Sequence, residues 1–145
     1  MNPEINARKI AIVGCGMVGA TSAFALMEQG LFSELVLVDV NRERAEGEAM
    51  DIGHGVPFIH PVEIYAGTYE DLADAYLVIV TAGANQLPGE SRINLTEKNV
   101  RIFQSIIPEI VRYNTECLLL IVANPVDILT TVALRLSGFP PERVI

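Results

Sequence analysis

A glycine-rich turn between an apolar strand and a helix constrains the fold of this chain more than any other feature. Residues 9–13 form an apolar run that ends at Gly14-x-Gly16-x-x-Gly19. An apolar run that stops at such a turn predicts a buried β-strand. Residues 18–29 contain no proline, are rich in Ala, Leu and Met, and are followed by Gly30, which predicts a helix and its end.

Each glycine of this turn has a different expected task, because strand, turn and helix together are the context of a dinucleotide-binding motif. Gly14 allows the tight turn, Gly16 lets the backbone approach a pyrophosphate, and Gly19 lets the helix lie close to the strand. The start of the helix then offers free N–H groups and a positive dipole end to the phosphates.

An acidic residue at the end of the next strand supports this interpretation. Residues 34–39 form a second apolar strand that ends in Asp39, about twenty residues beyond Gly19. A carboxylate there accepts hydrogen bonds from a ribose 2′-hydroxyl and repels a 2′-phosphate, so the predicted cofactor is NAD. The alternative is that Asp39 only caps a helix or a turn.

The rest of the chain alternates between strand and helix patterns, which predicts an α/β fold with helices on both faces of a parallel sheet. Right-handed crossovers favour a Rossmann-type doubly wound sheet of order 3-2-1-4-5-6, with the sixth strand cut short at the C-terminus. The ligand crevice is expected at the carboxyl ends of strands one, four and five. The expected strands are residues 9–13, 34–39, 62–66, 75–81, 116–122 and 142–145.

Two details of the helices are also predicted. Pro108 lies within the long helical pattern that begins at Ser91, and it should kink or divide that helix. Asn124 is expected to cap the helix that follows the fifth strand, with Pro125 in the first turn.

The composition excludes several classes of function. The chain has 145 residues, no Trp and a formal net charge of −8, which argues against nucleic acid or an anionic membrane as a partner. Cys15 and Cys117 are too few for a disulfide framework. The N-terminal residues are not basic and no apolar run approaches the ~20 residues needed to cross a bilayer, so we expect a cytoplasmic protein.

Four segments carry a resemblance to the lactate/malate dehydrogenase family. They are residues 50–55 (MDIGHG), 67–69 (GTY), 81–92 (TAGANQLPGESR) and 123–127 (ANPVD). The likeness extends over essentially the whole chain. It implies that residues 1–145 form the family's NAD-binding Rossmann domain and that the substrate domain is absent from this chain.

The resemblance also implies the residues of the site. Those expected to bind NAD are Gly14, Gly16, Val18, Gly19, Asp39, Arg44, Tyr69, Gly83, Ala84, Ser105, Val122, Ala123 and Asn124. Those expected near the substrate, a small 2-hydroxy or 2-keto acid, are Gln86, Arg92, Asn124 and Asp127, with Gln86 and Arg92 on a mobile loop. Gly83 and Gly89 are either hinges of that loop or ordinary turn glycines.

The chemistry of these residue types fits hydride transfer to a keto acid. A guanidinium at the substrate carbonyl stabilises the developing negative charge, which is the catalytic role expected of Arg92; otherwise Arg92 is a solvated charge at a helix start. The neutral Gln86 can border a methyl group, whereas an arginine there would pair a second carboxylate. This favours the L-lactate branch over the malate branch, and a non-catalytic NAD-binding module is the third alternative.

The chain lacks groups that the family's reaction needs. The family's proton-donating histidine and its carboxylate-binding arginine belong to the region after the sixth strand. His54 and His60 are expected to be structural, and no Cys/His spacing predicts a metal site. We therefore expect this chain to bind NAD without turnover and to expose the surface that would meet the missing domain, which favours self-association or marginal stability. A homo-oligomer is expected for the complete enzyme.

Overall fold

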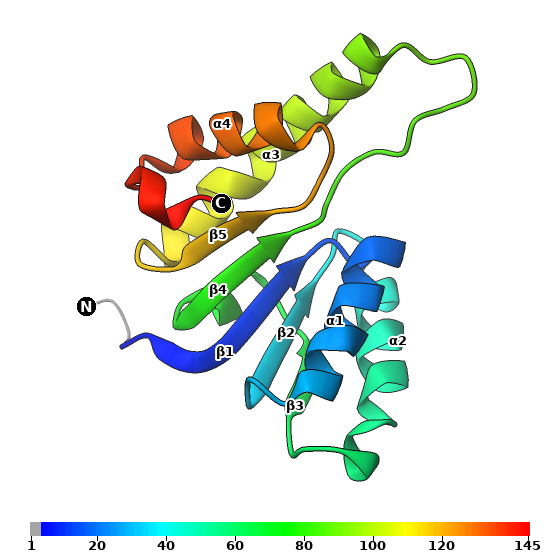
Figure 1. Ribbon diagram of the computed structural model, residues 1–145, viewed down its shortest axis with the longest axis vertical. Helices are drawn as coiled ribbons and strands as arrows, with labels where there is room; N and C mark the ends of the chain where they lie inside the picture. Colours follow the sequence, from blue (N-terminus) through cyan, green and yellow to red (C-terminus); the bar gives the residue numbers. More distant parts are fainter. Residues whose placement is uncertain (1–3) are drawn as a thin grey trace.

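A five-stranded parallel sheet forms the centre of the computed structural model, which describes residues 4–145 (Figure 1). Its order is β3-β2-β1-β4-β5, in agreement with the predicted Rossmann-type topology. The first three residues of the N-terminal segment used in the targeting argument lie outside the described residues. The strands are β1 (Asn6–Val13), β2 (Glu34–Val38), β3 (Glu63–Ala66), β4 (Ala75–Val80) and β5 (Leu118–Ile121).

Helices cover the two faces of the sheet in two separate groups. One face of β1, β2 and β3 is covered by α1 (Met17–Gln29) and α2 (Arg42–Gly53), and the opposite face of the sheet by α3 (Arg92–Tyr113) and α4 (Val126–Ser137) (Figure 1). The short 3-10 helices are η1 (Val56–Phe58), η2 (Tyr69–Leu72) and η3 (Pro141–Arg143).

Local sequence explains where several of these elements begin and end. The Asn41 side chain accepts a hydrogen bond from the Arg44 backbone N–H and so caps α2. Thr68 and Asp71 form a capping box at η2. α1 ends at Gly30, whose φ of 63° lies in the left-handed region that glycine adopts without a Cβ penalty.

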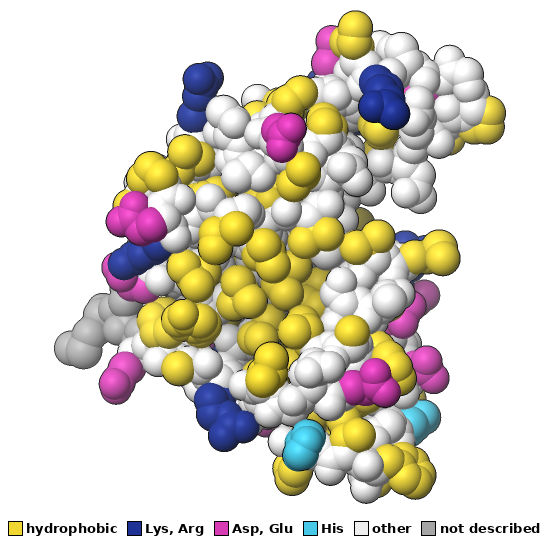
Figure 2. Space-filling model, viewed as in Figure 1, with side chains coloured by type: hydrophobic (Ala, Val, Ile, Leu, Met, Phe, Trp, Pro, Cys, Tyr) yellow, Lys and Arg dark blue, Asp and Glu magenta, His cyan; other side chains and the backbone are white. Residues whose placement is uncertain are grey.

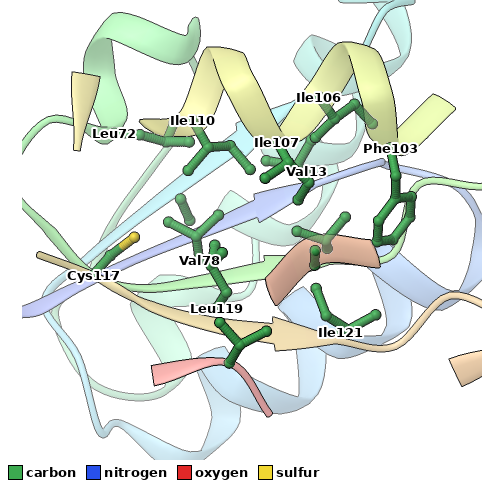
Figure 3. Close-up of a cluster of buried hydrophobic side chains, with 14 of the residues drawn as sticks. Val13, Leu72, Val78, Phe103, Ile106, Ile107, Ile110, Cys117, Leu119 and Ile121 are labelled. Atoms are coloured by element: carbon green, nitrogen blue, oxygen red, sulfur yellow. The ribbon is translucent and has the colours of Figure 1, made fainter. Parts of the chain in front are cut away.

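Two hydrophobic clusters hold the helices to the sheet. In the larger one, α3 places Phe103, Ile107 and Ile110 against strand residues such as Val78 and Leu119 (Figure 3). The second cluster lies on the other face and joins strand residues of β1 and β2 to α1 and α2. Because the helices pack on the faces of the sheet, the carboxyl ends of the strands are left free to form a site.

One part of the sheet has no helix over it. On the face that α1 and α2 cover elsewhere, three side chains stay partly exposed: Leu77 on β4, Leu120 on β5 and Val122 directly after β5. Figure 2 shows hydrophobic side chains gathered over β4 and β5 on this face. We call this partly exposed apolar surface the open sheet face.

One sequence-based expectation is narrowed and two need correction. α3 runs without interruption from Arg92 to Tyr113, so of the two effects expected of Pro108 the division of the helix does not occur. The N-cap of α4 is Pro125 rather than Asn124, and no side chain caps this helix. Residues 141–143 form η3 instead of a strand, because a proline at the first position of a helical turn needs no N–H partner. The sixth strand is represented by a single parallel bridge between Leu119 and Val144.

No helix within residues 4–145 is both long and apolar enough to cross a membrane.

Candidate functional site

A cleft of about 960 Å³ lies at the carboxyl ends of β1, β2 and β4. The prediction had placed it over strands one, four and five, but its walls come from the ends of β1, β2 and β4, from α1 and α2, and from one side of α3. The lining residues are Val13, Gly14, Cys15, Gly16, Met17, Val18, Gly19, Val38, Asp39, Val40, Arg44, Glu48, Tyr69, Thr81, Ala82, Gly83, Asn85, Ile102, Ser105 and Ile106.

The glycine turn forms the floor of this cleft. Gly14 has a φ of +105°, and a Cβ added there would lie 2.5 Å from the backbone nitrogen of Ala82. A Cβ at Gly19 would overlap the carbonyl oxygen of Gly14. At Gly16, by contrast, a Cβ would meet no described atom within 4 Å. Gly14 and Gly19 are thus required by the packing of the protein itself, whereas Gly16 faces open space.

Asp39 connects the end of β2 to the glycine turn. One carboxylate oxygen accepts a hydrogen bond from the Cys15 backbone N–H at 2.6 Å, and the other accepts from the Asn41 backbone N–H at 2.8 Å. Each oxygen of an ionised carboxylate can accept a further bond. Asp39 is half-buried and lines the cleft, so it fixes the turn and still has acceptor capacity toward a ligand.

The first turn of α1 presents its backbone donors at the same place. The first hydrogen bond of the helix runs from the Ala20 N–H to the Gly16 carbonyl, so the N–H groups of Met17, Val18 and Gly19 have no partner within the helix. No acidic side chain occupies this first turn. The positive end of the helix dipole is therefore available to an anion.

The end of β4 is tied to the turn as well. The Thr81 hydroxyl donates a hydrogen bond to the Gly14 carbonyl oxygen at 2.6 Å. Together, Asp39 and Thr81 attach the glycine turn to the strands on both of its sides.

The structure divides the predicted site residues into two groups. Nine of them line the cleft together: Gly14, Gly16, Val18, Gly19, Asp39, Arg44, Tyr69, Gly83 and Ser105. The remaining ones lie beside it, after β4 and β5: Ala84, Gln86, Arg92, Val122, Ala123, Asn124 and Asp127. The first group lines a single cleft, and the second group lies after β4 and β5, outside that cleft.

The segment between β4 and α3 projects from the body of the molecule (Figures 1 and 2). The Gln86 side chain donates to the Glu90 carbonyl oxygen at 2.8 Å, and Glu90 forms an ion pair with Lys98. A hydrogen bond from the Leu87 N–H, together with Lys98, lowers the pKa of the Glu90 carboxyl. Arg92 is the exposed first residue of α3, and within residues 4–145 its guanidinium has no hydrogen bond or ion pair.

Sequence reasoning missed one buried residue at this edge. Asn99 of α3 is 2% exposed and hydrogen bonds to the backbone of both Ala84 and Asn124. The available signal was its spacing, because Asn99 shares the apolar helix face of Phe103 and Ile106. Glu48 and Asn85 were also missed as lining residues, and nothing in their local sequence distinguishes them from surface residues.

Neither histidine belongs to the cleft. His54 caps the C-terminus of α2, and the His60 ring lies beside Gly30. Among the described residues there is no group of three or more His, Cys, Asp or Glu side chains that could hold a metal ion.

A glycine turn at a helix N-terminus, next to an acidic residue at the end of the second strand of a 3-2-1-4-5 sheet, defines a Rossmann-type dinucleotide-binding domain. Residues 8–145 match the family described as lactate/malate dehydrogenase, NAD binding domain. The chain belongs to this family, whose cofactor is NAD.

Related proteins and structures agree with this assignment. The chain is 54% identical over 145 residues to an L-lactate dehydrogenase of Acetivibrio thermocellus, which corresponds to all of this chain and 46% of that protein. It is 55% identical over 137 residues to L-lactate dehydrogenase 1 of Clostridium acetobutylicum, covering 94% of this chain and 44% of that protein.

A crystal structure of the minor L-lactate dehydrogenase from Enterococcus mundtii in a ligand-bound form is similar in fold. Its TM-score is 0.92 at 45% identity, with 95% of this chain and 44% of that chain covered. The chain thus spans less than half the length of the relatives that it matches.

Proposed function

We propose that the cleft holds NAD through the nine lining residues that the sequence singled out. The pyrophosphate lies over Gly16 and accepts hydrogen bonds from the free N–H groups of the first turn of α1. Asp39 accepts from the adenosine ribose, and Arg44 and Tyr69 flank the adenosine. The observation that carries this proposal is the Asp39 carboxylate, which is bonded to the glycine turn and also lines the cleft.

The direction of the cofactor follows from the order of the strands. With the adenosine ribose at the end of β2 and the pyrophosphate at β1, the nicotinamide extends toward β4 and β5, on the other side of the point where strand order reverses. Gly83, Ala84, Ser105 and the segment 122–124 then flank the nicotinamide half.

We further propose that this chain acts in an L-lactate dehydrogenase, together with a substrate domain as in its longer relatives. NAD supplies the hydride acceptor for lactate oxidation, and in reduced form the hydride donor for pyruvate. Arg92 stabilises the charge that develops on the carbonyl oxygen, and Asn124 and Asp127 border the substrate and the nicotinamide ribose. The unpaired, exposed guanidinium of Arg92 is free to take this role.

Gln86 is the residue that favours lactate over malate. Its side chain is neutral and exposed on the projecting segment, and its hydrogen bond within residues 4–145 is the one to the Glu90 carbonyl oxygen. A neutral amide borders the methyl group of pyruvate without an unpaired charge, whereas a second substrate carboxylate would lack a cation there.

The open sheet face supports a larger assembly. We infer that a substrate domain covers Leu77, Leu120 and Val122, because a contiguous apolar surface of this kind marks an interaction site. In this proposal the complete enzyme is a cytoplasmic homo-oligomer that acts on small molecules and binds neither nucleic acid nor membranes, consistent with the net charge of −8.

Calorimetric titration of the chain with NAD and NADP tests the cofactor proposal. Asp39 would face the 2′-phosphate of NADP, and a like-charge contact costs several kcal/mol, so NAD should bind much more tightly. Asp39→Ser should narrow that ratio by about tenfold or more. The ratio of NAD affinity to NADP affinity is the informative quantity, because damage to the glycine turn would lower both affinities. Equal affinities in the unaltered chain would contradict the role of Asp39.

Substrate choice is tested in the chain joined to a substrate domain. Gln86→Arg should shift preference from pyruvate toward oxaloacetate. The new cation pairs the second carboxylate of oxaloacetate, whereas with pyruvate it is left unpaired beside a methyl group. Gln86→Leu is the matched control, since it adds no charge and should keep the preference for pyruvate. An unchanged ratio of kcat/KM values in Gln86→Arg would count against the lactate assignment.

A further inference from the structure

Asn99 connects two segments that are far apart in the sequence. Its Oδ1 accepts a hydrogen bond from the Ala84 N–H at 2.7 Å, and its Nδ2 donates to the Asn124 carbonyl oxygen at 2.7 Å. The first segment follows β4 and the second follows β5. The N–H groups of residues 122–123 join the strand ends themselves by donating to the Val80 carbonyl oxygen, and the Asn99 amide joins the two segments just beyond those ends.

These bonds belong to a series of side-chain hydrogen bonds that connect neighbouring segments at the carboxyl ends of the strands. Asp39 joins the end of β2 to the glycine turn, Thr81 joins that turn to the end of β4, and Asn99 joins the segment after β4 to the segment after β5. In every case a side chain bonds to the backbone of another segment. Asp39 and Thr81 line the cleft, whereas Asn99 lies behind the part of the edge beyond it.

Asn99 contacts the backbone of the two segments and leaves the Asn124 side chain exposed. A Cβ on Gly83 would lie 3.4 Å from the Asn99 Oδ1, so the Gly83 backbone passes against the Asn99 amide. Asn99 bonds to the carbonyl of Asn124, whose own side chain is exposed. The Ala84 N–H and the Asn124 carbonyl have no other partner among the described residues, so loss of Asn99 would leave both of these backbone groups unpaired and would remove the link between residues 84 and 124.

We propose that Asn99 is a positioning residue for the nicotinamide half of the cofactor. It fixes Gly83–Ala84 against Ala123–Asn124 and so presents the two segments at one spacing. This inference rests on the proposed function, in which NAD extends from Asp39 toward β4 and β5. Asn99 touches no part of the adenosine end, and its effect should be confined to the nicotinamide end.

The test compares two buried asparagines of the same helix region. Asn114, which ends α3, is also 2% exposed, and its amide donates to the Leu72 and Ala75 carbonyls far from the cleft. Asn99→Asp and Asn114→Asp each replace a donor by a carboxylate that faces carbonyl oxygen. Both variants should lower the melting temperature, because both remove buried hydrogen bonds.

Titration of the unaltered chain and both variants with NADH and with ADP distinguishes a positioning effect on the nicotinamide half from general destabilisation. ADP contains the adenosine and pyrophosphate but no nicotinamide. Asn99→Asp should weaken NADH binding about tenfold or more and leave ADP binding unchanged, whereas Asn114→Asp should preserve the ratio of the two affinities. If Asn99→Asp does not fold, Asn99→Ser, which is too short to bridge both segments, should show the same selective loss.

The possible outcomes are distinct. An unchanged NADH-to-ADP ratio in a folded Asn99 variant would overturn the positioning role and leave the proposed function intact. If Asn114→Asp changed the ratio of NADH affinity to ADP affinity as much as Asn99→Asp does, the positioning role would also be overturned. The effect would then result from general destabilisation. If the unaltered chain bound neither NADH nor ADP, the proposed function would fail and the role of Asn99 with it.

Discussion

Two regions at the carboxyl ends of the strands, the glycine turn and the segment that projects between β4 and α3, are built in different ways. At the glycine turn, Gly14 and Gly19 are fully packed, and Asp39 and Thr81 bond to the backbone of the turn. At the other end, Gln86 and Arg92 are exposed on a projecting segment. The glycine-turn end is thus enclosed by residues of the described chain, whereas the substrate end has no second wall in the described structure.

This contrast bears on what each end needs in order to function. Backbone N–H groups and a short carboxylate keep their positions without help from another domain. A guanidinium on a long side chain needs a partner to hold it at an angle and distance suited to a reacting carbonyl. Capture of NAD and chemistry on the substrate should therefore be separable in experiments.

The largest expected effect concerns Arg92. In the chain joined to a substrate domain, Arg92→Gln should raise the barrier of the chemical step by about 2.7–4 kcal/mol, through lost stabilisation of the carbonyl oxygen. Single-turnover kinetics measures this. Because Arg92 lies outside the cleft, NADH affinity should stay the same. A variant that lost NADH binding instead would make Arg92 part of the cofactor site.

The second effect compares two glycines of one turn. Gly19→Ala should lower the free energy of unfolding by about 1–3 kcal/mol, since its Cβ overlaps the Gly14 carbonyl. Gly16→Ala, whose Cβ meets open space, should keep the stability and weaken NADH binding through contact with the pyrophosphate. Thermal unfolding and titration of both variants check this. The reverse pattern would mean that the two glycines have been assigned each other's roles.

The effect that is smallest at neutral pH, and that grows only in alkali, is a pH dependence of the stability caused by the two buried thiols. Burial raises the pKa of Cys15 and of Cys117 to about 12 from an ordinary value of 9.0. Since these thiols ionise earlier in the unfolded chain, their contribution to stability is complete below pH 9 and is lost as the pH rises toward 12. Each thiol should cost up to about 1.4 kcal/mol per pH unit in that window.

Urea unfolding between pH 8 and 10.5 measures this slope. Cys117→Ala should make the loss of stability with pH shallower, whatever its effect at pH 8. Gln86→Ala, a change in the exposed segment, should leave the slope as it is. If Cys117→Ala had the same slope as the unaltered chain, the thiol would not be the titrating group.

Much of the glycine-turn end could be read from the sequence because its residues form a motif of known spacing. The three glycines and the acid at the end of the second strand are recognisable without knowledge of their contacts, and the structure joins them through the bond from the Cys15 N–H to Asp39. The parallel order of strands also followed from the alternation of elements.

The features that sequence reasoning missed depend on contacts between distant segments. The spacing of Asn99 places it on the apolar face of α3, but only the packing of α3 on the sheet shows that its amide joins the segment after β4 to the segment after β5. The start of α4 at Pro125 and the 3-10 turn at residues 141–143 depend on how the chain leaves β5 and α4, which the local pattern does not specify.

One experiment tests most directly whether cofactor capture and chemistry are separate in this chain. The pure 145-residue chain is titrated with NADH by calorimetry, and the same sample is assayed for pyruvate reduction. We expect saturable binding of NADH and no turnover, because the described cleft contains no histidine or other proton donor placed for a keto acid, and general acid catalysis contributes ~10²–10⁴ in rate. Pyruvate reduction that saturates with NADH would contradict this division, and so would the absence of NADH binding.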